Sequence, residues 1–208
     1  MLCPLCHNEL KIKADNEYFV CSRCGAYVKD KAFYIKPTEE KARYEEHNND
    51  VNDTHYQQFV RPLVDIVLEN FTPANTGLDY GCGTGPVIAK MLEDKSYQVT
   101  RYDPFFYPDE RYLNYRYDFI CSCEVFEHFH QPKHEIQKLR ALLNPNGWII
   151  IMTHIYNGRI DFSRWYYRND PTHIFIYTEK TLRYIAEHFN FSLDIYSDRL
   201  VGFKKMPS

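Results

Sequence analysis

The segment of this chain that most constrains its fold is LDYGCGTGP, at residues 78–86. A short apolar stretch leads through Leu78 to Asp79, glycines follow at positions 81, 83 and 85, and the residues from Val87 onward have a helical pattern. This order predicts a strand, a tight turn and the N-terminus of a helix. Glycines let the backbone approach a ligand closely, and the free amides at a helix start favour an anionic or polar group. The spacing G-x-G-x-G differs from the G-x-G-x-x-G of a dinucleotide site.

The chain after residue 77 alternates between strand and helix patterns. Strands are predicted at 77–81, 97–102, 118–123 and 148–153, and helices at 86–94, 135–143 and 178–189. Residues 193–196 and 200–204 form a closing pair that we expect to be antiparallel. Residues 109–116 contain no clear apolar run, so a strand there is short or missing. The pattern predicts an α/β fold with a doubly wound, mostly parallel sheet and an antiparallel last strand.

Three features resemble the class I S-adenosylmethionine-dependent methyltransferases. They are the glycine turn, the acid Asp103 at the end of the second strand, and the helix, Asn-Pro-Asn-Gly turn and strand over residues 135–153. The resemblance covers about residues 55–208. It implies a Rossmann-like methyltransferase domain at 77–208, preceded by a helical linker and cofactor lid at 37–76.

The resemblance also implies which residues bind S-adenosylmethionine. The implied set is Asp79, Gly81, Cys82, Gly83, Gly85, Asp103, Pro104, Cys123 and Tyr56. Asp103 is where a doubly wound fold places a carboxylate on ribose hydroxyls, and Phe105 or Phe106 would lie along the adenine. Tyr56, His47 and Asn48 are candidates for the lid, with helix-cap and surface positions as the alternative for these three.

Two C-x-x-C pairs near the start of the chain predict a separate module at residues 1–36. The four residues are Cys3, Cys6, Cys21 and Cys24, and 14 residues separate the two pairs. This is the spacing of a four-cysteine zinc ribbon, and seven cysteines without an export signal favour metal binding over disulfides. A module of this size has too small a core to fold unaided, so Zn²⁺ would supply much of its folding free energy.

The charge of the ribbon bears on its role. It carries six basic residues (Lys11, Lys13, Arg23, Lys29, Lys31, Lys36) against four acidic ones (Glu9, Asp15, Glu17, Asp30). Four thiolates on Zn²⁺ add two negative charges, which leaves the module near neutral. A structural or substrate-gating role is therefore favoured over a grip on RNA.

A second cluster of chemically active residues follows the strand at 118–123. If residues 124–128 are helical, Glu124, Glu127 and His128 share one face at the carboxyl end of that strand, and His173 is a natural fourth partner. The E-x-x-E-H sequence and the later D-x-x-H-x-F-x-Y-T resemble the small-RNA 2′-O-methyltransferases and the ubiquinone-pathway O-methyltransferases. That resemblance implies that Glu124, Glu127, His128 and His173 hold a second divalent cation, Mg²⁺, Mn²⁺ or Zn²⁺, which binds adjacent substrate hydroxyls.

Other readings of this cluster stay open. Many class I methyltransferases carry E-V-x-E-H as architecture or in contact with the methionine part of the cofactor, with no metal bound. His173 is then a lone general base, or a core histidine paired with Glu124. Each of the catalytic interpretations places His128 or His173 near the methyl acceptor.

Together these features predict an S-adenosylmethionine-dependent methyltransferase acting on oxygen of a small or carrier-bound substrate. The ribbon also resembles those of ribosomal-RNA guanine and deoxysugar C-methyltransferases, so an RNA base or a carrier-linked sugar stays open, but the net charge of −3 disfavours nucleic acid. The other class of function is a non-catalytic cofactor-binding or zinc-ribbon interaction protein. The intact glycine turn and Asp103 argue against it. With no signal peptide and no long apolar run, we expect a cytoplasmic protein without membrane contact.

Overall fold

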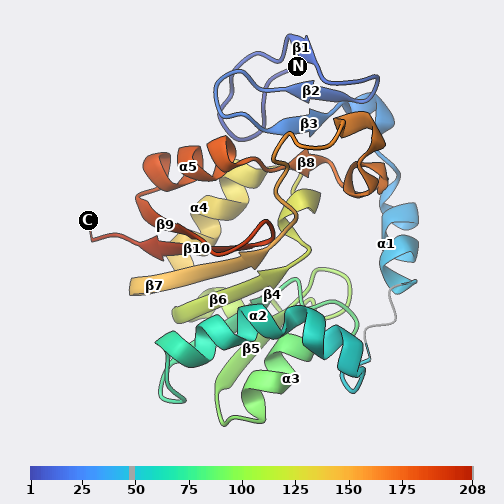
Figure 1. The fold of residues 1–208 in the computed structure, drawn as a ribbon. Coiled ribbons are helices and arrows are strands. Elements are labelled where there is room, and N and C mark those ends of the chain that lie inside the picture. The colour runs from blue at the N-terminus through green and yellow to red at the C-terminus, as the bar shows by residue number, and fades with distance from the viewer. Residues whose placement is uncertain (47–49, 208) are drawn as a thin grey trace.

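The computed structural model describes residues 1–46 and 50–207, and it contains two β-sheets (Figure 1). The larger sheet has six strands in the order β5-β4-β6-β7-β10-β9. Their bounds are β4 (Thr76–Tyr80), β5 (Gln98–Tyr102), β6 (Tyr117–Cys123), β7 (Leu143–Met152), β9 (Phe191–Ile195) and β10 (Leu200–Lys205). Neighbouring strands from β5 to β7 pair in parallel, and β10 pairs antiparallel with both β7 and β9. The predicted α/β fold with an antiparallel last strand is confirmed.

Helices cover both faces of this sheet. Figure 1 shows α2 (Thr54–Asn70) and α3 (Val87–Glu93) on one side, and α4 (Pro132–Leu142) and α5 (Glu179–His188) on the other. Side chains along β7 alternate between the two apolar layers: Ile150 packs in the cluster with α2 and α3, whereas Ile149 and Ile151 pack in the cluster with α4 and α5. The central strands are therefore apolar on both faces, as strands of a covered parallel sheet are.

The connections differ from the expectations in detail. Among the described residues, no strand lies between β5 and β6, and a 3₁₀ helix, η2 (Glu110–Asn114), takes its place. The other short helices are η1 (Lys31–Phe33), η3 (Phe126–His128), η4 (Phe162–Arg164) and η5 (Tyr166–Asn169). Helix α1 (Pro37–Glu45) runs from the N-terminal sheet along one side of the molecule (Figure 1). The lid candidates His47 and Asn48 lie outside the described residues.

The smaller sheet joins the N-terminal segment to a distant part of the chain. Strands β1 (Ile12–Lys13), β2 (Tyr18–Val20) and β3 (Tyr27–Lys29) pair antiparallel in sequence order, and β3 then pairs with β8 (Phe175–Ile176). The predicted ribbon therefore shares its sheet with a strand from the far end of the chain. Domain boundaries after residues 36 and 76 stay predictions.

None of the helices in residues 1–46 and 50–207 combines the length and the apolar composition that crossing a bilayer requires.

Candidate functional site

The glycine turn after β4 has a backbone that ordinary residues rarely adopt. Gly81 and Gly83 have φ angles of 79° and 65°. A Cβ atom on Gly81 would lie 2.4 Å from Cγ2 of Val125, so this position also has no room for a side chain. The amides of Gly81 and Cys82 donate to the carbonyl of Tyr102 at 2.8 and 3.1 Å, which ties the turn to the end of β5.

Asp79 lies one residue from the end of β4, and its side chain contacts α3. The carboxylate is buried and accepts a hydrogen bond from the amide of Ala89 in α3, at 3.1 Å. Burial raises the pKa of this carboxyl to about 7. Asp79 was predicted to contact the cofactor, but it does not line the cavity described next. Its hydrogen bond instead joins β4 to α3 beneath the glycine turn.

A cavity of about 930 Å³ opens at the carboxyl ends of β4, β5 and β6. Seven of the residues predicted for the cofactor line it: Gly81, Cys82, Gly83, Asp103, Pro104, Cys123 and Tyr56. Gly85 lies in an adjoining open hollow of about 510 Å³. Phe105 and Phe106 line the main cavity too. This is the edge at which parallel sheets of this kind bind their ligands.

The Asp103 carboxylate is held in one orientation by backbone amides. Oδ2 accepts from the amide of Gly83 at 3.1 Å, and Oδ1 accepts from the amides of Phe105 and Phe106 at 2.8 and 3.1 Å. The glycine turn and the end of β5 are therefore joined through this one side chain.

His128 and His173 line the same cavity, and they converge there on the buried side chain of Glu127. Their ligating atoms all lie within 4.8 Å of one another, and Oε1 of Glu127 is 3.7 Å from Nε2 of His128 and 3.9 Å from Nε2 of His173. The Nδ1 atoms face backbone carbonyls: that of His128 is 3.0 Å from the oxygen of Thr172, and that of His173 is 2.7 Å from the oxygen of Tyr167. A carbonyl only accepts, so each Nδ1 carries the proton and each neutral ring turns an Nε2 lone pair toward Glu127.

Burial disfavours the charged forms of Glu127 and His173. Glu127 is fully buried; Oε2 accepts from the hydroxyl of Thr153 at 2.8 Å, while Oε1 has no hydrogen-bond partner among the described residues. Burial raises the pKa of the Glu127 carboxyl to about 7 and lowers that of His173 to about 3. Three acceptor atoms thus face one another without a donor between them, an arrangement that a proton or a metal ion would complete.

Glu124 does not join this group, because residues 124–128 do not form the continuous helix that would place it on one face with Glu127 and His128. Glu124 has a φ angle of 53°, and its amide donates to the carbonyl of Met152 at 2.8 Å, so the chain turns before η3 begins at Phe126. The carboxylate lies 3.5 Å from Nη1 of Arg199. Glu124 still lines the cavity, and burial together with the charge of Glu127 raises its pKa to about 8.

Helix α1 contributes cavity residues that the sequence did not reveal. The ring of Tyr44 lies 5.3 Å from that of His128 and 5.7 Å from that of Phe105, measured between centroids. Arg43 pairs with Asp170 at 3.2 Å. The segment from residue 43 reads as a turn because it is rich in Asn and Asp, and α1 has no buried residue that would give it a clear apolar stripe.

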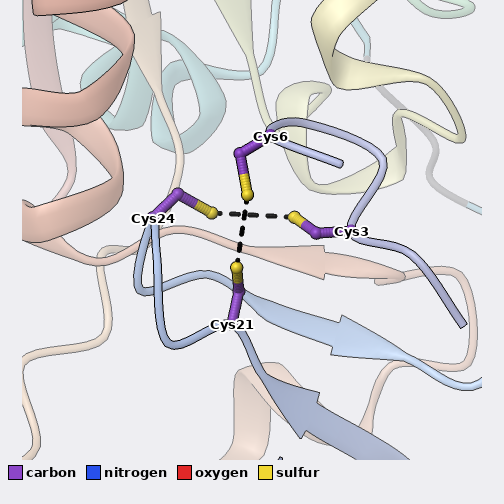
Figure 2. A group of neighbouring side chains, drawn as sticks. All are labelled: Cys3, Cys6, Cys21 and Cys24. Carbon is purple, nitrogen blue, oxygen red and sulfur yellow. Dashed lines mark hydrogen bonds between the residues drawn. The ribbon is translucent and has the colours of Figure 1, made fainter. Parts of the chain in front are cut away.

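The four N-terminal cysteines form the second candidate metal centre. Figure 2 shows the four sulfurs pointing toward one point. Cys3 and Cys24 have sulfurs 3.6 Å apart, and those of Cys6 and Cys21 are 3.3 Å apart. A tetrahedral zinc site with Zn–S bonds of about 2.3 Å separates its sulfurs by about 3.8 Å, so the arrangement fits Zn²⁺. The contact between Cys3 and Cys24 lowers the pKa of Cys3 to about 5 and raises that of Cys24, because one thiolate and one thiol share a hydrogen bond.

Comparison with known families identifies the larger unit. A model of a methyltransferase domain family matches residues 53–194, which is more than half of the chain. The chain belongs to this family. The prediction of a methyltransferase is thereby confirmed. The match begins just before α2, so the matched residues follow the four-cysteine segment and α1. No match was found among proteins of curated function.

Solved structures show the same fold at low sequence identity. An O-methyltransferase family protein from Burkholderia thailandensis has a TM-score of 0.53 and 15% identity, and the alignment covers 85% of this chain and 64% of that one. A 1,6-didemethyltoxoflavin-N1-methyltransferase from the same organism, solved with S-adenosylhomocysteine, has a TM-score of 0.53 and 18% identity over 93% of this chain and 97% of its own. A chain from a complex of the Haloferax volcanii Trm112 methyltransferase activator with a putative methyltransferase has a TM-score of 0.61 and 12% identity, over 82% and 96%.

Proposed function

We propose that this methyltransferase uses S-adenosylmethionine to methylate an oxygen atom of a small or carrier-bound substrate, with Glu127, His128 and His173 at the acceptor. The observation that carries the proposal is that one cavity is lined both by the glycine turn with Asp103 and by His128 and His173, whose imidazoles converge on the buried carboxylate of Glu127. The first group suits a nucleoside-containing methyl donor, and the second suits activation of a hydroxyl.

The donor end of the cavity fits S-adenosylmethionine, whose sulfonium makes its methyl group an electrophile. The Asp103 carboxylate accepts hydrogen bonds, so it can bind the two ribose hydroxyls. Phe105 and Phe106 offer flat apolar surface for adenine. Tyr56 and Cys123 line the wall beyond the glycine turn, toward the methionine part.

The acceptor end fits a divalent cation. Glu127 Oε1 lacks a partner among the described residues, and the two Nε2 atoms point at it. Each histidine also donates Nδ1–H to a backbone carbonyl, which is how metal-binding imidazoles are fixed. A mixed carboxylate and imidazole set suits Mg²⁺, Mn²⁺ or Zn²⁺, and such an ion lowers the pKa of an acceptor hydroxyl.

Methyl transfer then requires an in-line acceptor oxygen and a base that takes its proton. The acceptor oxygen forms a bond to the methyl carbon as the carbon–sulfur bond breaks, and the electron pair of that bond stays on sulfur. The acceptor hydroxyl loses its proton. Glu124 lines the same cavity and has a pKa raised to about 8, so it is the candidate base. The main task of the chain is to hold donor and acceptor in line.

Calorimetry tests the two halves of the proposal separately. We expect the zinc-loaded protein to bind S-adenosylmethionine and, independently, Mn²⁺. Glu127→Gln and His173→Ala should abolish Mn²⁺ binding and leave binding of the methyl donor unchanged, because these residues lie at the acceptor end. His188→Ala, on α5, is the matched control and should change neither.

Each failure points to a different error. A protein that binds no S-adenosylmethionine at millimolar ligand is not the proposed enzyme. Mn²⁺ binding that survives His173→Ala contradicts the ligand assignment.

A further inference from the structure

The N-terminal ribbon holds the backbone of the segment that carries His173. The amide of Lys29 donates to the carbonyl of Ile174 at 2.9 Å, at the start of the β3–β8 pairing. The hydroxyl of Tyr18 donates to the carbonyl of His173 itself at 2.5 Å. Arg168, at the other end of the segment, pairs with Asp15 of the ribbon at 2.7 Å. The ribbon therefore fixes residues 168–176 at several points.

The same segment positions the acceptor cluster on its other side. The carbonyl of Thr172 accepts from Nδ1 of His128, and the amide of Ile174 donates to the carbonyl of Glu127 at 2.9 Å. His173 is itself part of the segment. All three members of the cluster thus depend on where residues 172–174 lie.

Lys29 of the ribbon has a buried side chain whose ammonium group is surrounded by fixed backbone carbonyls. It is 2% exposed, and its Nζ lies 3.0 Å from the carbonyl of Pro171 and 3.5 Å from that of Asp170. The carboxylate of Glu17, at 3.9 Å, is its ion-pair partner. Burying an ammonium group is costly unless hydrogen bonds replace its water, so the two carbonyls and the Nζ constrain one another. The carbonyl of Asp170 also accepts from the amide of His173, which makes 170–173 a turn.

We propose that Lys29 is a positioning residue for the acceptor site: by holding the carbonyls of the 170–173 turn, it sets the ring directions of His128 and His173. The ribbon is then a structural part of the active site, because its Lys29 holds the backbone of a turn whose residues line the cavity. This inference rests on the proposed function for the role of the cluster, but the geometry it describes is independent of which ion or base acts there.

Lys29→Met tests the role with little change of shape, and Tyr18→Phe removes only the hydroxyl that donates to His173. Lys180→Met is the matched control, because Lys180 donates to the carbonyl of Ser22 at 2.7 Å and so also joins the ribbon to the domain, away from the turn. Zinc content and binding of S-adenosylmethionine should be unchanged in all three. Loss of such an outer partner weakens metal binding by about 10- to 100-fold. We expect a loss of Mn²⁺ affinity of this size in Lys29→Met and a smaller loss in Tyr18→Phe. Lys29→Arg should regain part of the affinity that Lys29→Met loses. The control Lys180→Met should bind Mn²⁺ as tightly as the wild type.

Nitrogen NMR of the imidazoles gives a readout that does not need a bound ion. The Nδ1–H signals of His128 and His173 should shift or broaden in Lys29→Met and Tyr18→Phe, while the signal of His188 stays in place. Unchanged signals in both variants would overturn the inference, as would wild-type Mn²⁺ affinity in both. If the wild-type protein binds no Mn²⁺ yet the imidazole signals respond, the cation proposal fails and the positioning role of Lys29 stands.

Discussion

At Gly81, the proposed cofactor site depends on the absence of a side chain. Two separate features require glycine here: the left-handed backbone and the lack of space beside Val125. Gly158 is a control, because its backbone is also left-handed but the space around it is open. A Cβ on Gly158 would meet nothing within 4 Å. Gly158→Ala should therefore cost about 1 kcal/mol from backbone strain alone.

Gly81→Ala should cost more, about 2–4 kcal/mol, because Val125 is β-branched and cannot turn away from the new methyl group. The turn would also shift, so binding of S-adenosylmethionine should weaken severely, and in Gly158→Ala it should not. Urea unfolding and calorimetry measure the two effects. Equal stabilities for the two variants would mean that the turn relaxes around the methyl group.

Asp79 predicts a pH dependence of stability. Burial raises its pKa from 3.8 to about 7, so between these values the folded chain holds a proton that the unfolded chain has lost. Stability from this group therefore falls as pH rises through that window, and the loss is complete above about pH 7. Asn at this position has no charge to bury, and its oxygen can still accept from the amide of Ala89.

The free energy of unfolding of Asp79→Asn, relative to wild type, should accordingly rise by about 2–3 kcal/mol between about pH 5 and about pH 8. Urea unfolding of both proteins at the two pH values, saturated with zinc and without cofactor, gives the difference. A pH-independent difference would show that the carboxylate is not desolvated as described.

At the scale of elements, the strands and helices that were predicted correctly are those marked by a pattern of neighbouring residues in the sequence. β6 and β7 were expected at 118–123 and 148–153 and lie at Tyr117–Cys123 and Leu143–Met152. Apolar residues from Phe119 to Cys121 and from Trp148 to Met152 mark them, because both faces of the sheet are covered. β7 begins five residues earlier than expected, so the predicted Asn-Pro-Asn-Gly turn lies within the strand. The helix expected at 178–189 is α5, and the side chain of Thr178 caps it by accepting from the amide of Thr181.

The elements that the sequence did not predict are those whose pairing is distant. β8 has two residues and pairs with β3 nearly 150 positions earlier, so no pattern around Phe175 and Ile176 marks it as a strand. Glu124 does not share a face with Glu127 and His128, because it has a left-handed backbone before η3 and its amide donates to the carbonyl of Met152 in β7. Convergence of Glu127, His128 and His173 was foreseen from residue types, whereas their support by Lys29 required the three-dimensional contacts.

At the scale of the molecule, one apolar core extends from the ribbon into the large sheet. The same cluster contains Cys3, Leu5 and Val28 from the N-terminal segment and Leu78 and Ile120 from the central strands. β8 adds backbone pairing to this shared packing. A ribbon joined in this way should not unfold as an independent module.

Chelation of the zinc ion that we expect at the four cysteines tests this prediction. Four buried thiols without their ion should loosen the ribbon, and because it shares a core and a sheet with the rest, the whole protein should lose stability. A loss of a few kcal/mol lowers the melting temperature of a chain of this size by roughly 10 °C. Calorimetric scans of the zinc-loaded and chelator-treated protein should each show a single transition, with the second at lower temperature. Two transitions after chelation, the upper at the original temperature, would instead show that residues 1–36 are a separate folding unit, and the ribbon would then act on the acceptor site only through its surface contacts.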